Sequence, residues 1–364
     1  MAMVLTLVTG ELSAQDVTTE SQRTVNQALS WLADQQNADG SWSANVGYKL
    51  NQDYKITAKV APHPGVTALA GMAFLAAGNL PDRGLYGDVI ARATNYVVSR
   101  VTEEGFVSDS GTRMYSHAFA TLFLAEVYGM THQREFRSKL QRAVDYIVKA
   151  QNAEGSWRYL PYAVESDMSI TVCQLNALRA ARNVGIRVPA STIDRAAAYV
   201  ASSYVHEDSG YMWRGEGYYD LGRGSFRYQA QRHTRSSFAL TAAGIAALQN
   251  AGLHGETLTA GNAQIDLKAS VAFLKEHYPW VSGRSPWSNH YFYWYGHYYA
   301  TQAFYVIGGV DWEWYYPRIR EELVVGQEAD GSWPCSVGPG RTFSTSMAAL
   351  ILSLPYGYLP IFQR

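Results

Sequence analysis

The chain has 364 residues, of which 47% are hydrophobic and 17% charged, and its formal net charge at pH 7 is -1. This balance gives no electrostatic case for nucleic acid or an anionic membrane as a partner. The two cysteines, Cys173 and Cys335, exclude a disulfide framework by number and lack the spacing of a metal or redox motif. No apolar run of the sequence reaches the ~18 residues that a transmembrane segment needs.

The first 23 residues allow two interpretations. Residues 3–8 are apolar and residues 12–15 resemble a small-residue cleavage site, but no basic residue precedes the apolar stretch. Residues 1–23 are therefore either a leader or the remnant of a signal peptide. The compartment stays open between the cytoplasm and export through a truncated signal peptide.

The chain then alternates between two kinds of helix. Residues 24–36 place Val25, Leu29 and Leu32 at helical spacing on one face. An Asp-Gly pair follows, and glycine supplies the left-handed cap that ends many helices. Residues 64–78 are apolar all round and rich in Ala and Gly, which indicates a buried helix. An amphipathic outer helix followed by a buried inner helix is the expected unit.

A seven-residue phrase marks the units. Residues 36–42 read Gln-Asn-Ala-Asp-Gly-Ser-Trp, and close copies occupy 151–157 and 327–333. We assign degenerate copies to 103–106, 207–213 and 286–287. Such a recurrence predicts an array of similar units. Trp42, Trp157 and Trp333 are expected to be buried where neighbouring units meet, rather than in a central cavity.

Six helix pairs result from this pattern. The outer helices are predicted near 24–36, 88–101, 137–150, 192–204, 264–277 and 312–327, and the inner helices near 64–78, 115–129, 167–184, 233–251, 289–307 and 342–354. Six pairs can close into an all-α (α/α)6 toroid, with almost no sheet and a central hole, which removes the exposed ends of an open superhelix. Without a Ser/Pro-rich linker, residues 24–364 are expected to form one domain.

Two later segments are unusual. The fifth inner helix is surrounded by aromatic residues, and two stripes could face the cavity: Trp294, Tyr298, Thr301 and Tyr305, or Tyr291, Tyr295, Tyr298 and Gln302. Its rings could plug the hole, hold an apolar ligand or carbocation, or stack on a sugar. The Gly/Tyr/Arg-rich insert at 211–227 is either a lid or a surface loop.

The repeated phrase, followed by a Gly/Ala-rich helix, resembles the prenyltransferase and squalene-oxidase repeat. That family includes squalene-hopene cyclases, class II diterpene cyclases and protein prenyltransferase β subunits. The resemblance covers roughly residues 24–358 and implies the toroid. It implies much less about activity, because similar toroids serve polysaccharide lyases and non-catalytic domains.

The site is expected where the N-termini of the inner helices open at one mouth of the ring. Helix N-termini offer unpaired N–H groups and a partial positive charge. Although helix capping explains many polar residues there, it does not predict the clustered His and Arg. The predicted ligand-binding residues are His63, Tyr115, His233, Arg235, Tyr291, Trp294, His297, Tyr298 and Arg341. Arginines around the mouth could hold a diphosphate or carboxylate.

Asp167, at the start of the third inner helix, is the main catalytic candidate. The resemblance implies an acid at a comparable position, which protonates an alkene in class II cyclases. Only Glu165-x-Asp167 of the family's Asp-rich motif is present, with Met168 where a further Asp is expected. Burial beside Glu165 could raise the pKa of Asp167. Asp167 could equally be a helix cap. Glu165, His117 and His290 are the other catalytic candidates.

No cofactor is predicted. Asp167 and Cys173 are six residues apart, so they do not reproduce the zinc ligands that the prenyltransferase resemblance would imply. A zinc site remains an alternative if His117, His233 or His290 converges with a carboxylate.

Two classes of function follow. In the first, the toroid binds, and as an enzyme transforms, an isoprenoid-like apolar ligand in an aromatic cavity, as a terpene cyclase-like isomerase or lyase or a prenyltransferase-like transferase. In the second, it is a glycan-active toroid, lyase- or hydrolase-like, or a non-catalytic binding scaffold. The expected partner is thus a small apolar molecule or a glycan, not nucleic acid. Oligomeric state is not predicted.

Overall fold

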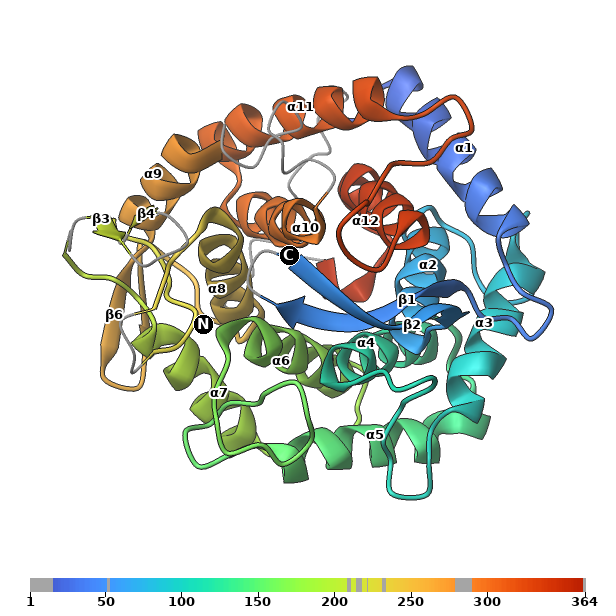
Figure 1. Cartoon of the computed structure of the whole chain (residues 1–364), viewed down its shortest axis with the longest axis horizontal. Helices are drawn as coiled ribbons and strands as arrows, with labels where there is room; N and C mark the ends of the chain where they lie inside the picture. Colours follow the sequence, from blue (N-terminus) through green and yellow to red (C-terminus); the bar gives the residue numbers. More distant parts are fainter. Residues whose placement is uncertain are drawn as a thin grey trace, which may run out of the picture.

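The computed structural model describes residues 16–50, 53–207, 211–213, 218–220, 222–230, 234–278 and 290–362. These residues contain twelve α-helices in two concentric layers (Figure 1). The outer layer consists of α1 (Thr19–Asp34), α3 (Gly87–Ser99), α5 (Arg137–Ala150), α7 (Ala190–Ser202), α9 (Leu267–His277) and α11 (Gly309–Gly326). The inner layer consists of α2 (Pro64–Ala76), α4 (Met114–Thr131), α6 (Met168–Asn183), α8 (Phe238–Asn250), α10 (Tyr291–Ile307) and α12 (Arg341–Ser353).

The inner helices form a closed ring. Each of them packs against the next inner helix, and α12 packs against α2 (Figure 1). The outer layer closes as well, because α1 contacts α11. The predicted all-α toroid is therefore confirmed, and the open superhelix is excluded. None of the described helices is long and apolar enough to cross a bilayer.

The inner helices are buried on all sides because their residues are mainly apolar, and in α2 and α8 many of these residues are small. Every residue of α2 is buried, and so are nearly all residues of α8. Gly71 of α2 lies where a Cβ atom would approach the Phe123 ring of α4 to 2.5 Å. The outer helices bury only one face, as their amphipathic sequences predict.

The repeated phrase holds successive units together. In each of its three full copies the Trp indole N–H donates to a carbonyl of the preceding outer helix, from Trp42 to Leu32 (2.7 Å), Trp157 to Ile147 (2.8 Å) and Trp333 to Leu323 (2.9 Å). In all three copies the Gln side chain donates to a carbonyl of the next outer helix. The last of these bonds runs from Gln327 to the Thr24 carbonyl of α1, and so closes the ring.

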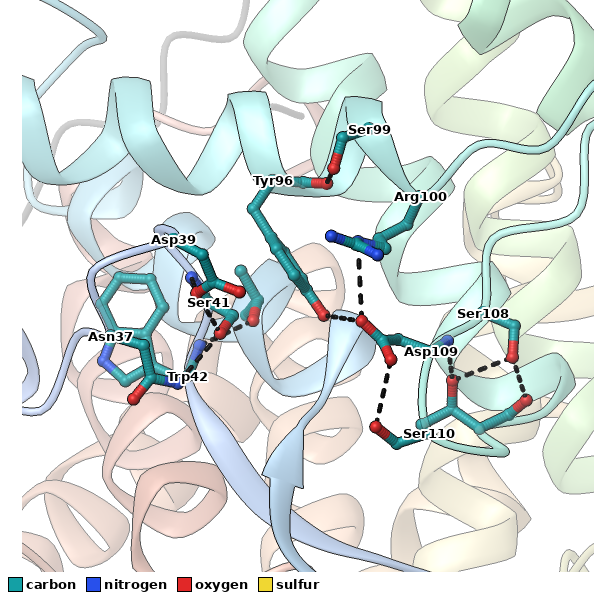
Figure 2. Close-up of polar contacts among 12 residues, drawn as sticks. Asn37, Asp39, Ser41, Trp42, Tyr96, Ser99, Arg100, Ser108, Asp109 and Ser110 are labelled. Atoms are coloured by element: carbon teal, nitrogen blue, oxygen red, sulfur yellow. Dashed lines mark hydrogen bonds and ion pairs between the residues drawn. The ribbon is translucent and has the colours of Figure 1, made fainter.

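The glycine of the phrase lets the loop contact the next outer helix. Gly155 has φ +84°, and a Cβ atom there would lie 2.6 Å from the Arg195 carbonyl oxygen of α7. Gly40 and Gly331 approach α3 and α1 in the same way. Figure 2 shows the first of these loops, in which Ser41 donates to Asp39. The three tryptophans are at most 2% exposed, as expected for joints between units.

The fourth joint is not where the sequence placed it. Residues 207–213 were expected to carry the degenerate copy, but Gly224-Ser225-Phe226 has the joint's geometry. A Cβ atom on Gly224 would lie 2.4 Å from the Ala269 backbone of α9. The Phe226 N–H donates to Thr241 of α8, as the Trp157 N–H does to Thr171 of α6. The sequence does carry the Gly-Ser-aromatic motif at this position, with Phe in place of Trp.

The expectation of almost no sheet was wrong for one segment. Besides the short hairpins β3 (Tyr211–Trp213)/β4 (Tyr218–Asp220) and β5 (Thr257–Ala260)/β6 (Ala263–Asp266), residues 43–62 form a longer antiparallel pair, β1 (Ser43–Leu50) and β2 (Asp53–Pro62). Apolar and polar residues alternate along β2, which is the period of a strand. The β1–β2 hairpin crosses the centre of the inner ring (Figure 1).

The opposite end of the ring is covered by the C-terminal segment. The short 3-10 turn η4 (Pro360–Phe362) contacts α4 and α6. The Ile361 N–H donates to the carboxylate of Glu126 on α4 at 3.2 Å. Glu126 is fully buried, and burial raises its pKa to about 8.

Candidate functional site

A cavity of about 340 Å³ lies between the β1–β2 hairpin and the N-terminal ends of the inner helices. All six inner helices, or the residues just before them, contribute to its wall, so it occupies the mouth that the sequence singled out. The volume lies within the range of small-molecule sites. The wall is mostly apolar and aromatic, and its aromatic members are Tyr48, Tyr54, Tyr115, Phe119, Tyr159, Tyr228, Phe238, Tyr291, Phe292, Tyr293, Tyr295 and Phe343.

The hairpin is fixed over this cavity by aromatic contacts. Tyr54 of β2 meets Tyr291 of α10 edge-on, with ring centroids 5.6 Å apart. On the other side, the guanidinium of Arg113, which precedes α4, lies 4.6 Å from the ring of Tyr48. The β1–β2 hairpin therefore joins the α4 and α10 sides of the ring and forms the roof of the cavity.

Asp167 lies directly behind the cavity wall. It is the N-cap of α6 and is fully buried. Its Oδ1 accepts hydrogen bonds from the Ser169 N–H (2.8 Å), the Ser169 hydroxyl (2.6 Å) and the Ile170 N–H (3.2 Å). Its Oδ2 is buried as well. Asp167 thus caps its helix through one oxygen only.

Burial raises the pKa of Asp167, and the Ser169 hydroxyl and the nearby Tyr228 hydroxyl lower it in part. Tyr228 also shares a short hydrogen bond with Tyr159. On the other side, the Tyr115 hydroxyl donates to Ser169 Oγ at 2.6 Å. Ser169 and the three tyrosines line the cavity, so the acid is connected to the wall by hydroxyl groups.

Glu165 does not pair with Asp167. Its side chain is exposed and borders a separate, more polar hollow with Glu154 and Tyr199. Burial is the main cause that raises the pKa of Asp167, and Glu165 is not among the groups that affect this pKa most. The expectation that a neighbouring carboxylate would raise this pKa was therefore wrong, because the chain turns between 165 and 167 and leaves only Asp167 inside.

Two predicted histidines are helix caps. His63 Nδ1 accepts from the Val66 N–H (3.2 Å) and His290 Nδ1 accepts from the Phe292 N–H (3.1 Å). His63 lines the cavity, and burial lowers its pKa to about 4, which keeps it neutral. His290 lies against the rings of Tyr291 and Phe292 and is not part of the wall.

His117 is a joint residue rather than a cavity residue. Its Nδ1 accepts from the Val107 N–H at 3.1 Å, and its ring packs on Phe106 and Tyr146 of the outer layer. This is the role that Thr171 has toward Trp157 in the third unit. Burial lowers the pKa of His117 to about 3. Its position gives it no contact with a ligand in the cavity.

The fifth inner helix presents the start of the second predicted stripe to the cavity. Tyr291 and Tyr295 line the wall, whereas Trp294 and Tyr298 are buried between helices. His297 faces outward, where its Nδ1 lies 2.9 Å from the Tyr315 hydroxyl of α11. Of the predicted ligand-binding residues that the structure describes, only His63, Tyr115, Arg235 and Tyr291 are in the wall.

Arg341 points away from the cavity. It pairs with Glu328 at 2.5 Å and donates to the Ser332 hydroxyl at 2.8 Å, in the third copy of the repeated phrase. It therefore stabilises a joint and lies outside the cavity wall. His233 lies outside the described residues. Within the described part of the chain, no three His, Cys, Asp or Glu residues are grouped closely enough to hold a metal ion.

Several residues of the cavity wall were not predicted from the sequence. Tyr48, Lys49 and Tyr54 come from the unexpected hairpin, and Tyr159 and Tyr228 come from loops that precede α6 and α8. The strand period of β2 could have revealed the hairpin. The 211–227 insert was considered as a lid, but its strands β3 and β4 lie at the outer edge of the ring (Figure 1). The β1–β2 hairpin occupies the lid position instead.

Comparison with known proteins supports this fold. The model of the squalene-hopene cyclase C-terminal domain matches residues 5–124. No curated protein matches the chain. Among solved structures, the type II terpene cyclase MstE from Scytonema, bound to geranylgeranyl dihydroxybenzoate, is 12% identical, with a TM-score of 0.59 over 94% of this chain and 98% of that one.

Glycan-active enzymes share the fold too. Cellobiose 2-epimerase from Bacillus thermoamylovorans B4167 is 13% identical, with a TM-score of 0.58 over 93% of this chain and 99% of that one. An unsaturated glucuronyl hydrolase specific for heparin is 13% identical, with a TM-score of 0.56 over 93% of this chain and 97% of that one. At such identities the structures show the fold alone. Together with the family match over residues 5–124, they show that the chain has the α/α toroid fold that these proteins share.

Proposed function

We propose that this squalene-cyclase-like toroid binds an isoprenoid-like substrate in the cavity under the β1–β2 hairpin and that Asp167 protonates it. The observation that carries the proposal is the setting of Asp167, a fully buried acid whose Oδ1 accepts three hydrogen bonds and whose hydroxyl neighbours Ser169 and Tyr228 line the cavity. The reaction is the isomerisation of an alkene to a cyclic or rearranged alkene through a carbocation.

The cavity wall suits a carbocation. Aromatic ring faces stabilise a positive charge by ~0.5–2 kcal/mol each, and the wall carries rings from the hairpin, from loops and from α4, α8, α10 and α12. No Asp or Glu is among the described residues of the wall, so no carboxylate there would trap the cation as an ester. An apolar enclosure also keeps water from quenching it.

Asp167 has the properties of the required acid. Because burial raises its pKa, its carboxyl group holds a proton at a higher pH than an exposed aspartic acid. When the proton leaves, three donors already face Oδ1, and hydrogen bonds to a charged oxygen are about twice as strong as neutral ones. The capping bonds therefore stabilise the carboxylate that the reaction produces.

The proton balance of the step is simple. The π electron pair of a substrate C=C bond takes the acid proton, which forms a C–H bond and a carbocation and leaves Asp167 as a carboxylate. Ring closure moves the cation along the substrate through further C=C bonds. The final cation then loses a proton from a neighbouring carbon to solvent, which restores an alkene, and Asp167 regains a proton from solvent. The product therefore has the same formula as the substrate.

The hydroxyl groups next to Asp167 connect it to the substrate space. Asp167 itself is not in the wall. Ser169 and Tyr228 line the cavity and also interact with the Asp167 carboxyl group. The chain from Tyr115 through Ser169 to Asp167 Oδ1 consists of two bonds of 2.6 Å. Hydroxyl groups can rotate and so both donate and accept, which allows a proton to pass between the acid and the cavity.

Turnover in D2O tests the proposal. The purified protein is incubated with squalene, geranylgeraniol or geranylgeranyl dihydroxybenzoate, and the products are separated by mass. Protonation of an alkene predicts an isomer that carries one solvent deuterium. Asp167→Asn keeps the side-chain size and a capping oxygen but removes the acid, so it should abolish the product at an unchanged melting temperature. Asp88→Asn, an exposed change on α3, is the matched control.

Two results would contradict the proposal. One is an unchanged rate in Asp167→Asn. The other is conversion of disaccharides or oligosaccharides, with no isoprenoid product, by protein whose native mass spectrum shows a retained sugar. The second result would assign the chain to the glycan-active group of this fold.

A further inference from the structure

Three basic side chains border the same cavity from three separate segments of the chain. Lys49 is on β1, Arg113 precedes α4 and Arg235 precedes α8. They are far apart in the sequence, and the toroid places all three on the wall of one cavity. No Asp or Glu is among the described residues of the wall, so the wall itself carries only positive formal charge.

Lys49 and Arg235 lie against the same two aromatic rings. The Lys49 ammonium is 5.3 Å from the centre of the Tyr228 ring and 4.8 Å from that of Phe292. The Arg235 guanidinium is 5.4 and 5.5 Å from the same two centres. Two like charges held against one pair of rings repel each other across a medium less polar than water. An anion beside them would convert that repulsion into attraction.

Arg113 completes the arrangement from the α4 side. Its guanidinium packs on Tyr48, the residue next to Lys49 on β1. A guanidinium carries its N–H donors in one fixed plane, so they can form paired hydrogen bonds to carboxylate or phosphate oxygens. Neither Lys49 nor Arg113 forms an ion pair with a described carboxylate.

We infer that the cavity takes an isoprenoid with an anionic head group, carboxylate or phosphate, which Lys49 and Arg113 bind together with Arg235 while the apolar tail lies on the aromatic wall. This inference rests on the proposed isoprenoid substrate and adds its head group. It also gives the β1–β2 hairpin a role in specificity, because the hairpin supplies Lys49.

The tail has an apolar surface available below the head group. Val66 and Leu69 of α2, Phe119 of α4 and Met347 of α12 belong to the wall and carry no charge. The wall is therefore divided into a basic part at the hairpin and an uncharged part at the inner helices. An amphiphile matches this division better than a wholly neutral hydrocarbon does.

Binding of three ligands with one tail tests the inference. Farnesol, farnesoic acid and farnesyl diphosphate are titrated in metal-free buffer, with tyrosine and tryptophan fluorescence as the signal. We expect the acid, the diphosphate or both to bind at least tenfold more tightly than the alcohol, since one hydrogen-bonded charge pair contributes about this factor. The anion whose affinity exceeds that of farnesol by the larger factor identifies the head group.

Charge removal identifies the residues. Lys49→Gln and Arg113→Gln should each remove most of the anion's advantage, roughly tenfold, and leave farnesol binding within about twofold. Lys59→Gln is the matched control, because it removes one positive charge from an exposed position of the same hairpin. If Lys59→Gln has the same effect as Lys49→Gln, the affinity for the anion depends only on the net charge of the protein, and the inference is overturned.

The remaining outcomes separate the inference from the proposed function. If all three ligands bind equally, the head-group inference fails and the isoprenoid cavity stands. If none of them binds to folded protein, the isoprenoid ligand class fails with it. Circular dichroism of each variant establishes that a loss of binding comes from the side chain and not from unfolding.

Discussion

Ser169 Oγ donates a hydrogen bond of 2.6 Å to Asp167 Oδ1, and the same Ser169 oxygen accepts one of 2.6 Å from Tyr115. The serine therefore acts on the acid and on the cavity wall at once. Since it donates to Asp167, it favours the carboxylate and lowers the pKa of the acid against the effect of burial. Its role is that of a positioning residue.

Ser169→Ala should raise the pKa of Asp167 and weaken the acid. We expect kcat to fall about tenfold, in line with the loss of one hydrogen bond to a charged group. Activity needs the protonated acid, so the basic limb of the kcat–pH profile should move to higher pH. Ser169→Thr keeps the hydroxyl and should restore both values. A lower kcat with an unmoved basic limb would mean that the serine serves packing only.

The helical layers could be predicted because they depend on pattern alone. Buried inner helices such as α2 and α8 need only small apolar residues, and the Gly-Ser-Trp phrase fixes where units join. Even the fourth joint, at Gly224 and Phe226, carries a visible signal once Phe is accepted in place of Trp. An error of a few residues in the predicted bounds of a helix or a joint does not change the predicted architecture.

The cavity wall could not be predicted from the same pattern. Successive side chains along a helix are rotated by about 100° from each other. An error of one or two positions therefore decides whether a side chain is predicted to face the cavity or a neighbouring helix. Tyr295 faces the cavity and His297 faces α11 for this reason. His117 resembled a site residue because a His there performs the task of a Thr at other joints. Only the packed structure distinguishes these roles.

Gly155→Ala tests the joint between α5 and α7. The new methyl group would lie 2.6 Å from the Arg195 carbonyl oxygen, at φ +84°. We expect a loss of about 3 kcal/mol in the free energy of unfolding, from backbone strain and overpacking together. Gly111→Ala is the control, because Gly111 has a similar φ of +83° with nothing within 4 Å. It should cost only about 1 kcal/mol.

Urea denaturation of both variants gives the comparison. Equal losses in Gly155→Ala and Gly111→Ala would show that backbone strain alone accounts for the cost, and that close approach of the loop to the next outer helix contributes nothing.

Trp157 should contribute both packing and one hydrogen bond. Trp157→Ala is expected to destabilise the protein by ~3–5 kcal/mol, as other large core truncations do. Trp157→Phe keeps most of the packing but leaves the Ile147 carbonyl without its donor, which should cost ~1–3 kcal/mol. Thermal and urea midpoints measure both changes. A wild-type midpoint in Trp157→Ala would refute the structural role of this residue.

Glu126 should make the protein less stable as the pH rises from about 4.5 to 8. Its pKa is raised from 4.5 to about 8 by burial against the C-terminal segment, so the folded state holds the proton more tightly than the unfolded state does. The stabilisation is complete below the unfolded pKa and is lost as pH approaches the folded pKa. His63 and His117 have lowered pKa values, so their effect has the opposite sign and ends near pH 6.5.

The interval from pH 6.5 to 8 therefore isolates the carboxyl groups, and Glu126→Gln isolates this one. Glutamine keeps an oxygen for the Ile361 N–H but cannot ionise. One pKa unit corresponds to about 1.4 kcal/mol, so the stability of the variant relative to wild type should rise by about 2 kcal/mol across this interval. Asp167, whose pKa is also raised, affects both proteins equally and cancels. Parallel stability curves for the two proteins would show that Glu126 is already ionised in the folded chain.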